Sequence, residues 1–242
     1  MNRKSAFLTT TMGVCLTAMV CCALWGSAFP CIKIGYQLFQ IDGNDISSQL
    51  LFAGCRFTLA GLLTILLGSL MNRRPLIPRK TSWIRIAKLS LFQTVIQYLF
   101  FYVGLAHTTG VKASIIEASN VFVAILIASL IFRQEKLDKH KIIGCIAGFA
   151  GVVLININQS GLDMSLSLTG EGFILLSTIA YAVSSVLIKI YSREDNPVML
   201  SGWQFLLGGI IMILCGYLTG GSVSVWTAPS ISMLFYLAAV SA

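Results

Sequence analysis

The sequence predicts an all-α, polytopic helical membrane protein, built as an inverted repeat of helices. Three observations support this prediction: the composition, a series of long apolar runs, and a regular alternation of basic and uncharged loops. Hydrophobic residues make up 56% of the 242-residue chain and charged residues only 11%, and the mean hydropathy is +0.84. Because an ordinary soluble domain has about 25% charged residues, this composition favours a membrane protein.

Seven apolar runs are long enough, or nearly long enough, to cross a bilayer as helices, since a core of about 30 Å needs roughly 20 helical residues. The fifth run is short if it stops at Ile157, and an eighth, from about Ile231 to Ala242, is too short to span. Continuously apolar runs do not fit strands, which would alternate in polarity. The seven runs cover about residues 12–34, 50–71, 87–106, 112–132, 142–157, 170–190 and 199–219.

The distribution of charge predicts an orientation in the membrane. The formal net charge is +8, which could suggest a nucleic-acid partner, but the basic residues gather in alternate loops instead of one patch. The loops at about 37–49, 107–111, 158–169 and 220–229 contain no Lys or Arg. By the positive-inside rule, the N-terminus is expected in the cytoplasm, in a multi-pass protein of the cell membrane with no nucleic-acid partner.

An internal repeat is the most informative pattern in the chain. The segments around Lys33 and Lys189 are both apolar helices with an aromatic residue eight positions before a lone lysine. The segments 54–61 and 202–209 match in the same order. A basic, apolar N-terminus could also be a cleaved signal peptide, but the first helix has a counterpart in the middle of the chain, where no signal peptide can lie.

The repeat defines two expected domains, residues 1–158 with helices 1–5 and residues 159–242 with helices 6–7 and the start of helix 8. An odd number of spans places the second unit upside down relative to the first, as in inverted-repeat transporters. By this alignment Ala242 corresponds to Thr94 in helix 3. We therefore expect a second repeat that is incomplete and a chain that is truncated.

Four segments in a fixed order now indicate a family. They are 25–33 in the first helix, Arg56-Phe57 in the second, 135–153 at the junction of helices 4 and 5, and 181–189 in helix 6. In these the chain resembles the drug/metabolite transporter superfamily, specifically its EamA-type ten-helix members. The resemblance implies a five-plus-five inverted repeat that transports, and commonly exports, small organic solutes. The chain differs where family members usually carry a proline in helix 4 and it reads Ser119-Asn120.

Polar groups inside the membrane are candidates for function, because burying charge there costs several kcal/mol. Lys33 either extends to the interface or takes part in a charge network. Arg56 either forms a structural pair with Glu117 or binds a substrate carboxylate. All three are expected within roughly 10 Å of the outer boundary. The candidate substrate-binding residues are Trp25, Ser27, Arg56, Gln93, Gln97, Glu117, Asn120, Tyr181, Trp203 and Gln204.

Other residues have structural interpretations beside functional ones. Pro30 is expected to kink the first helix, and Gly144, Gly148 and Gly151 are expected to allow close helix packing. Gln93 and Gln97, one turn apart, either hydrogen-bond between helices or line a cavity. Trp203 either lines that cavity or anchors a helix end at the interface. All seven cysteines lie in apolar runs, and neither a metal site nor a cofactor is predicted.

The function favoured by these patterns is secondary transport of a small organic metabolite, such as an amino-acid-like solute or a drug, by alternating access. The expected partners are that solute, the lipid bilayer and a coupling proton or cation; the oligomeric state is left open. The first alternative is a truncated, non-transporting fragment or an auxiliary membrane subunit. An intramembrane enzyme is the second, but no nucleophile–base set and no nucleotide-binding loop occurs in the sequence.

Overall fold

The computed structural model describes residues 10–108, 110–134, 137–157 and 168–241, and the regular elements in these ranges are all helices. The prediction of an all-α membrane protein is confirmed. The α-helices are α2 (Thr11–Leu38), α3 (Ile46–Asn72), α4 (Ser82–Leu89), α5 (Gln97–Ala106), α6 (Gly110–Ala118), α7 (Asn120–Leu126), α8 (Lys139–Ile157), α9 (Phe173–Tyr191), α10 (Pro197–Leu218) and α11 (Ala228–Ser241). Three π-helical segments adjoin them: η1 (Ser90–Ile96), η2 (Ile127–Ile131) and η3 (Leu168–Gly172).

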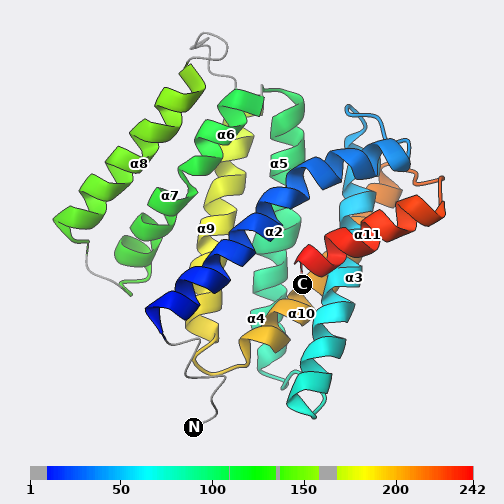
Figure 1. Cartoon of the computed structure of the whole chain (residues 1–242), viewed down its shortest axis with the longest axis horizontal. Coiled ribbons are helices and arrows are strands. Elements are labelled where there is room, and N and C mark those ends of the chain that lie inside the picture. Colours follow the sequence, from blue (N-terminus) through cyan, green and yellow to red (C-terminus); the bar gives the residue numbers. More distant parts are fainter. Residues whose placement is uncertain (1–9, 109, 135–136, 158–167, 242) are drawn as a thin grey trace.

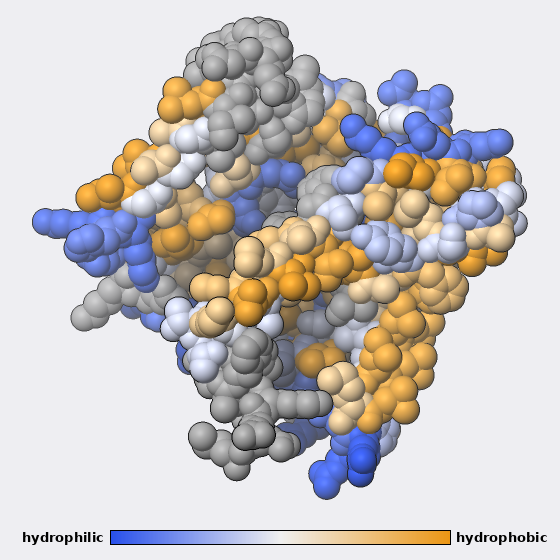
Figure 2. Space-filling view, in the orientation of Figure 1, coloured by the Kyte–Doolittle hydropathy of each residue, from blue (hydrophilic) through white to orange (hydrophobic). Residues whose placement is uncertain are grey.

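Four stretches of described residues are long and apolar enough to cross a membrane: Ile46–Asn72, Ser82–Leu105, Leu168–Tyr191 and Pro197–Leu218. The second joins α4, η1 and α5, and the third joins η3 and α9. Shorter apolar helical stretches lie at Thr11–Leu24, Ile115–Ile131 and Ala228–Val240. Figure 2 shows hydrophobic surface along the sides of the helices and hydrophilic surface gathered towards their ends. This is the distribution that a bilayer requires of a multi-pass protein.

The ends of the helices follow local chemistry. Asp45 caps α3 by accepting a hydrogen bond from the Ser48 backbone N–H at 3.1 Å. Asn196 caps α10 in the same way, accepting from the Val198 N–H at 2.9 Å, and Pro197 follows at the first helical position. Short polar side chains suit these positions because they satisfy the free N–H groups of the first turn.

The helices are arranged around a central pair, α3 and α10. α4 and η1 pack on α10, while α11 packs on α3; α9 packs on η1 and α5, while α2 packs on α11. By the sequence repeat, α11 matches the start of the third helix and α2 matches α9. The packing of α4 and η1 on α10 therefore corresponds to the packing of α11 on α3. The packing of α9 on η1 and α5 corresponds to the packing of α2 on α11. In Figure 1, α2 crosses the front of the bundle and α8 lies at one edge.

Glycines bring α3 and α10 into backbone contact. A Cβ atom placed on Gly61 would lie 2.5 Å from the Leu206 nitrogen and 2.7 Å from the Gly202 oxygen. On Gly54 it would lie 2.9 Å from the Gly209 oxygen. Because no real Cβ approaches backbone so closely, only glycine fits these positions, as in other tightly packed membrane helices.

The two glycine contacts are reciprocal. Gly54 and Gly61 of the first repeat match Gly202 and Gly209 of the second, and Gly54 meets Gly209 while Gly61 meets Gly202. Rising residue numbers on one helix pair with falling numbers on the other, so α3 and α10 are antiparallel. A contact in which matched positions exchange partners is what a two-fold axis between the two helices produces.

The glycines of α8 behave differently from the expectation of close packing. A Cβ placed on Gly144, Gly148 or Gly151 would meet nothing within 4 Å among the described atoms. α8 contacts α6, and these glycines lie on its open sides. The prediction of close helix contact at these three glycines is therefore not met here, because spacing along one helix does not reveal which face another helix covers.

We expect Gly61→Ala to lower the thermal midpoint of the protein in detergent by several degrees. The added methyl group must push α3 and α10 apart, and overpacking of this kind costs about 1–3 kcal/mol. The matched control is Gly148→Ala, which adds the same methyl group in open space. It should leave the midpoint unchanged or raise it, since alanine is the better helix former. Equal losses in the two variants would contradict the packing described here.

Candidate functional site

Arg56 is the centre of the candidate site. It lies on α3, its relative exposure is 4%, and its Nε atom has no hydrogen-bond partner. Its guanidinium carbon lies 4.5 Å from the centroid of the Phe57 ring and 6.0 Å from that of Tyr98. Aromatic faces attract a cation at such distances but do not neutralise its charge. Arg56 is therefore a buried cation that retains the capacity to bind an anion.

Aromatic residues from four helices surround Arg56. Phe57 stacks on Phe205 of α10, with ring centroids 5.5 Å apart and ring planes 11° apart. Tyr98 of α5 packs on Phe57 at 4.7 Å. The Tyr36 hydroxyl, from α2, donates a hydrogen bond to the Tyr102 hydroxyl at 3.2 Å. The sequence interpretation missed all three tyrosines: Tyr98 and Tyr102 lie within an apolar run, and Tyr36 lies two residues after the end of another.

Arg56 lies further from the start of its helix than the apolar run suggested. α3 begins at Ile46, four residues before the expected start at residue 50, so Arg56 lies ten residues into a helix of 27. At about 1.5 Å per residue this is about 15 Å from the helix start. Because Asp45 and residues 46–49 precede the apolar run, the expected position of Arg56 within roughly 10 Å of the outer boundary stays a prediction.

Gln204 occupies the position of Arg56 in the second repeat. It is fully buried, its Oε1 accepts a hydrogen bond from the Thr94 hydroxyl at 3.2 Å, and its Nε2 has no partner. Arg56 and Gln204 each precede a phenylalanine of the stacked Phe57–Phe205 pair. The two repeats therefore each contribute a buried donor group that lacks an acceptor to the region where they meet.

Arg56 and Glu117 do not form the ion pair that the sequence allowed. Both are described by the structure, and no carboxylate oxygen of Glu117 lies within 4.0 Å of the guanidinium. The Tyr98 hydroxyl lies within electrostatic range of Arg56, Glu117 and Tyr181. Of these groups, Arg56 is the one with a ring contact to Tyr98, at 6.0 Å from its centroid.

The remaining polar candidates are partly buried. Gln93, Gln97 and Asn120 each hold a buried side-chain oxygen without a hydrogen-bond partner. Gln93 lies in the π-helical η1 and Gln97 directly follows it. A π-helix has i→i+5 hydrogen bonds, so a spacing of four residues does not by itself place Gln93 and Gln97 on one face, as it would in an α-helix. π-Helical segments often mark functional sites.

Three candidates lie elsewhere. The Trp203 Nε1 donates to the Leu76 carbonyl at 2.8 Å and its ring packs edge-on against Trp83 at 5.2 Å, so this side chain binds the segment between α3 and α4 and the start of α4. The Ser27 hydroxyl contacts the Tyr236 hydroxyl at 2.8 Å. The side chain of Trp25 lies outside the described residues.

Two residues of α2 lie on the surface. The Lys33 side chain is exposed, as extension to the interface would require. Pro30 is exposed too, and α2 runs through it as one helix. Pro30 therefore neither ends the helix nor faces the Arg56 site.

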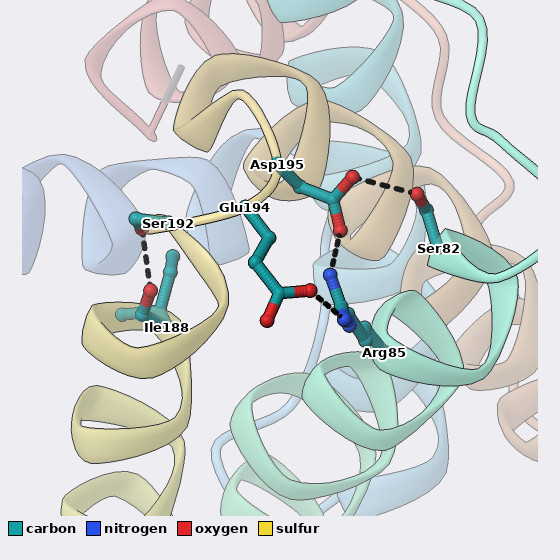
Figure 3. Close-up of polar contacts among 6 residues, drawn as sticks. All are labelled: Ser82, Arg85, Ile188, Ser192, Glu194 and Asp195. Carbon is teal, nitrogen blue, oxygen red and sulfur yellow. Dashed lines mark hydrogen bonds and ion pairs between the residues drawn. The ribbon is translucent and has the colours of Figure 1, made fainter.

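A charged cluster ties the two repeats together at the end that carries the basic loops (Figure 3). Arg85 of α4 donates to Asp195 at 2.6 Å and also pairs with Glu194, and both acids lie between α9 and α10. The Ser82 hydroxyl donates to Asp195 at 2.8 Å. Asp195 is 9% exposed; burial raises the pKa of its carboxyl, but the Ser82 and Arg85 hydrogen bonds outweigh this and hold the pKa below its ordinary value.

A second polar link lies at the opposite end of the helices. The Thr108 hydroxyl donates to the Glu171 carboxylate at 2.7 Å, and the Lys112 ammonium lies 3.4 Å from the same oxygen. Glu171 belongs to η3, whereas Thr108 lies in the turn between α5 and α6 and Lys112 lies in the first turn of α6. The partners of Glu171 come from the other repeat.

An all-helical bundle with a central cation, no strand among its described residues and polar links at both ends has the features of a membrane transporter. The match to a family model identifies the class further: residues 12–157 and 168–242 match the EamA-like transporter family. The chain belongs to that family.

Relatives in three kingdoms share the similarity. A chloroplastic WAT1-related protein of Arabidopsis thaliana is 27% identical over 88% of this chain and 50% of its own length. The uncharacterized transporter YvbV of Bacillus subtilis is 25% identical over 88% of this chain and 66% of its own. A transporter of Archaeoglobus fulgidus is 30% identical over 88% of this chain and 71% of its own. The chain spans between half and about two thirds of the first two relatives. No solved structure matches it.

We expect Asp195→Asn to lower the thermal midpoint at pH 7, because it removes a charge-assisted contact with Arg85, worth about 1–3 kcal/mol when buried. The pKa of this carboxyl is lowered by folding, so its contribution is present above the ordinary value near 3.9 and is lost as the pH falls below it. The difference between the two proteins should therefore shrink below about pH 4 in a thermal denaturation series.

The control for this series is Asp138→Asn, at an exposed carboxylate whose ion-pair partner among the described residues is the exposed His140. It should change the midpoint little at any pH. A wild-type midpoint equal to that of Asp195→Asn at pH 7 would show that the cluster does not stabilise the protein.

Proposed function

We propose that the protein is a secondary transporter that moves a small organic solute with an anionic group across the cell membrane. The observation that carries this proposal is Arg56, a buried guanidinium with a free Nε and no ion-pair partner among the described residues. A charge at such depth is costly and is rarely retained without a role. A planar guanidinium binds carboxylates with two parallel hydrogen bonds.

The proposed mechanism is alternating access between two inverted repeats, residues 1–158 and 159–242. The reciprocal contact of α3 and α10 supports it, because inverted repeats that meet near the substrate can rock about that contact. Arg56 and Gln204 would bind the solute from the two repeats, with Phe57 and Phe205 beneath it. The N-terminus is placed in the cytoplasm on the basis of the basic loops.

Further groups have secondary roles in this proposal. Glu117 would carry a coupling proton, since it is an acid in an apolar helical stretch that forms no ion pair with a described residue. Gln93, Gln97 and Asn120 would offer acceptor oxygens to the polar part of the solute. Tyr181 would complete the aromatic wall. The same site would serve import or export, and the direction would depend on the gradients.

The test uses the purified chain in proteoliposomes. A ligand is first identified by its thermal stabilisation of the protein, with solutes tested in matched pairs of a carboxylate and its carboxamide. Counterflow then measures the transport of that ligand. Arg56→Gln should abolish the preference for the carboxylate and reduce transport at least tenfold, since a charge-assisted bidentate contact is worth about 1.5–3 kcal/mol. Arg56→Lys should retain part of both, because it keeps the charge but loses the planar fork.

The matched control is Lys33→Gln, which removes one exposed cation and should leave binding and transport near wild type. Unchanged carboxylate preference in a folded Arg56→Gln protein would refute the assigned role. In the same liposomes, a pH gradient should no longer drive solute uptake by Glu117→Gln, but this variant should still exchange solute. Loss of exchange as well would assign Glu117 to solute binding.

A further inference from the structure

The loop between α3 and α4, residues 73–81, carries a concentrated and unneutralised positive charge. Arg73, Arg74, Arg79 and Lys80 are all exposed, and none of them forms an ion pair with a described residue. The sequence contains no Asp or Glu between Asp45 and Glu117. Four free cations therefore lie at one point where two membrane-spanning helices end.

The backbone of this loop is fixed by contacts on both sides. The Leu76 carbonyl accepts from Trp203 Nε1 at 2.8 Å, and the Leu76 N–H donates to the Ser69 hydroxyl at 3.1 Å. Arg73 ends α3 in the left-handed region, with φ of 50°. Pro78 is buried. The cations are thus presented by an ordered loop, which reduces the entropy lost on binding a ligand.

A shallow pocket of about 190 Å³ opens between this loop and the start of α10. Its wall includes Pro75, Ile77 and Arg79 on the loop and Glu194 and Asp195 across from it. Both acids are paired with Arg85, as Figure 3 shows, and the nearby Arg79 also helps to lower the pKa of the Asp195 carboxyl. The pocket therefore combines the Arg79 guanidinium, which forms no ion pair with a described residue, with an apolar edge and two carboxylates already paired with Arg85.

The surroundings of the loop are apolar and exposed. Ile77 is 72% exposed, and Met71, Trp83 and Ile84 continue exposed hydrophobic surface onto the flanking helices. A soluble anion would use the cations but not this surface. A phospholipid would use both, since its phosphate lies at the headgroup level and its acyl chains run along the helices.

We propose that the 73–81 loop is a binding site for an anionic phospholipid of the leaflet that it faces. The phosphate contacts Arg79 and the neighbouring free cations of the loop, and the acyl chains lie along Ile77 and Ile84. Charge complementarity, the ordered loop and the continuity of its cations with lipid-exposed apolar surface support this occupant. The site is independent of solute transport.

The test is native mass spectrometry of the purified protein with phosphatidylglycerol or phosphatidylcholine of identical acyl chains. Wild-type protein should retain phosphatidylglycerol at least tenfold better, and Arg74→Gln/Arg79→Gln should lose most of this preference. The matched control is Arg133→Gln/Lys139→Gln, which removes two exposed cations from another basic segment and should keep the preference. Glycerol phosphate in excess should not displace the lipid, because it lacks acyl chains.

The outcomes separate a site from general attraction. Equal loss in the two double variants would show that only total charge matters, and equal retention of the two lipids would show that no anionic site exists; either overturns the proposal. Displacement by glycerol phosphate would assign the site to soluble phosphates and also overturn it. Should Arg74→Gln/Arg79→Gln not fold, Arg74→Gln alone must still lower the preference severalfold, and an unchanged preference would refute the site.

Discussion

Backbone contact between α3 and α10 positions the rest of the molecule. Four glycines allow the two helices to approach without side chains between them, at Gly54 with Gly209 and at Gly61 with Gly202. In a bilayer, where apolar side chains gain little by leaving lipid, such close packing is a main source of helix association. The other described helices that pack on this pair do so in matching ways on its two sides.

The same contact explains why the buried donors lie where they do. Arg56 and Gln204 occupy matched positions next to the stacked Phe57 and Phe205, midway between the two glycine contacts. Because the two backbones touch at the glycine pairs, the space midway between these pairs is occupied by side chains. The Arg85 cluster and the Glu171 group then connect the two repeats at opposite ends of the helices.

The sequence predicted much of the architecture because hydrophobic length and the repeat are local, one-dimensional signals. The matched segments at 54–61 and 202–209 already contained the four packing glycines. The sequence could not show which glycines meet another helix, so Gly144, Gly148 and Gly151 were expected to pack but meet no described atom within 4 Å. The same limit explains why Tyr36 and Tyr98 were missed: their importance depends on the neighbours that tertiary packing brings to them.

Charge pairing was predicted least well, for a related reason. Similar depth along the apolar runs allowed a pair of Arg56 and Glu117 as one alternative, but the two side chains do not pair. The contact of Arg85 with Asp195, across more than a hundred residues of sequence, was not predicted at all. Segments distant in sequence determine such contacts, and composition says nothing about them.

Disulfide cross-linking in membranes tests the central antiparallel contact most directly. The Ser47 hydroxyl donates to the Thr219 carbonyl at 3.2 Å, so these residues lie at the same end of α3 and α10. In a variant without the seven native cysteines, Ser47→Cys with Thr219→Cys should cross-link rapidly under mild oxidation. Ser47→Cys with Val198→Cys should not, because Val198 lies at the far end of α10, beside Gly68. Cross-linking of the Val198 pair in place of the Thr219 pair would contradict the antiparallel glycine contact.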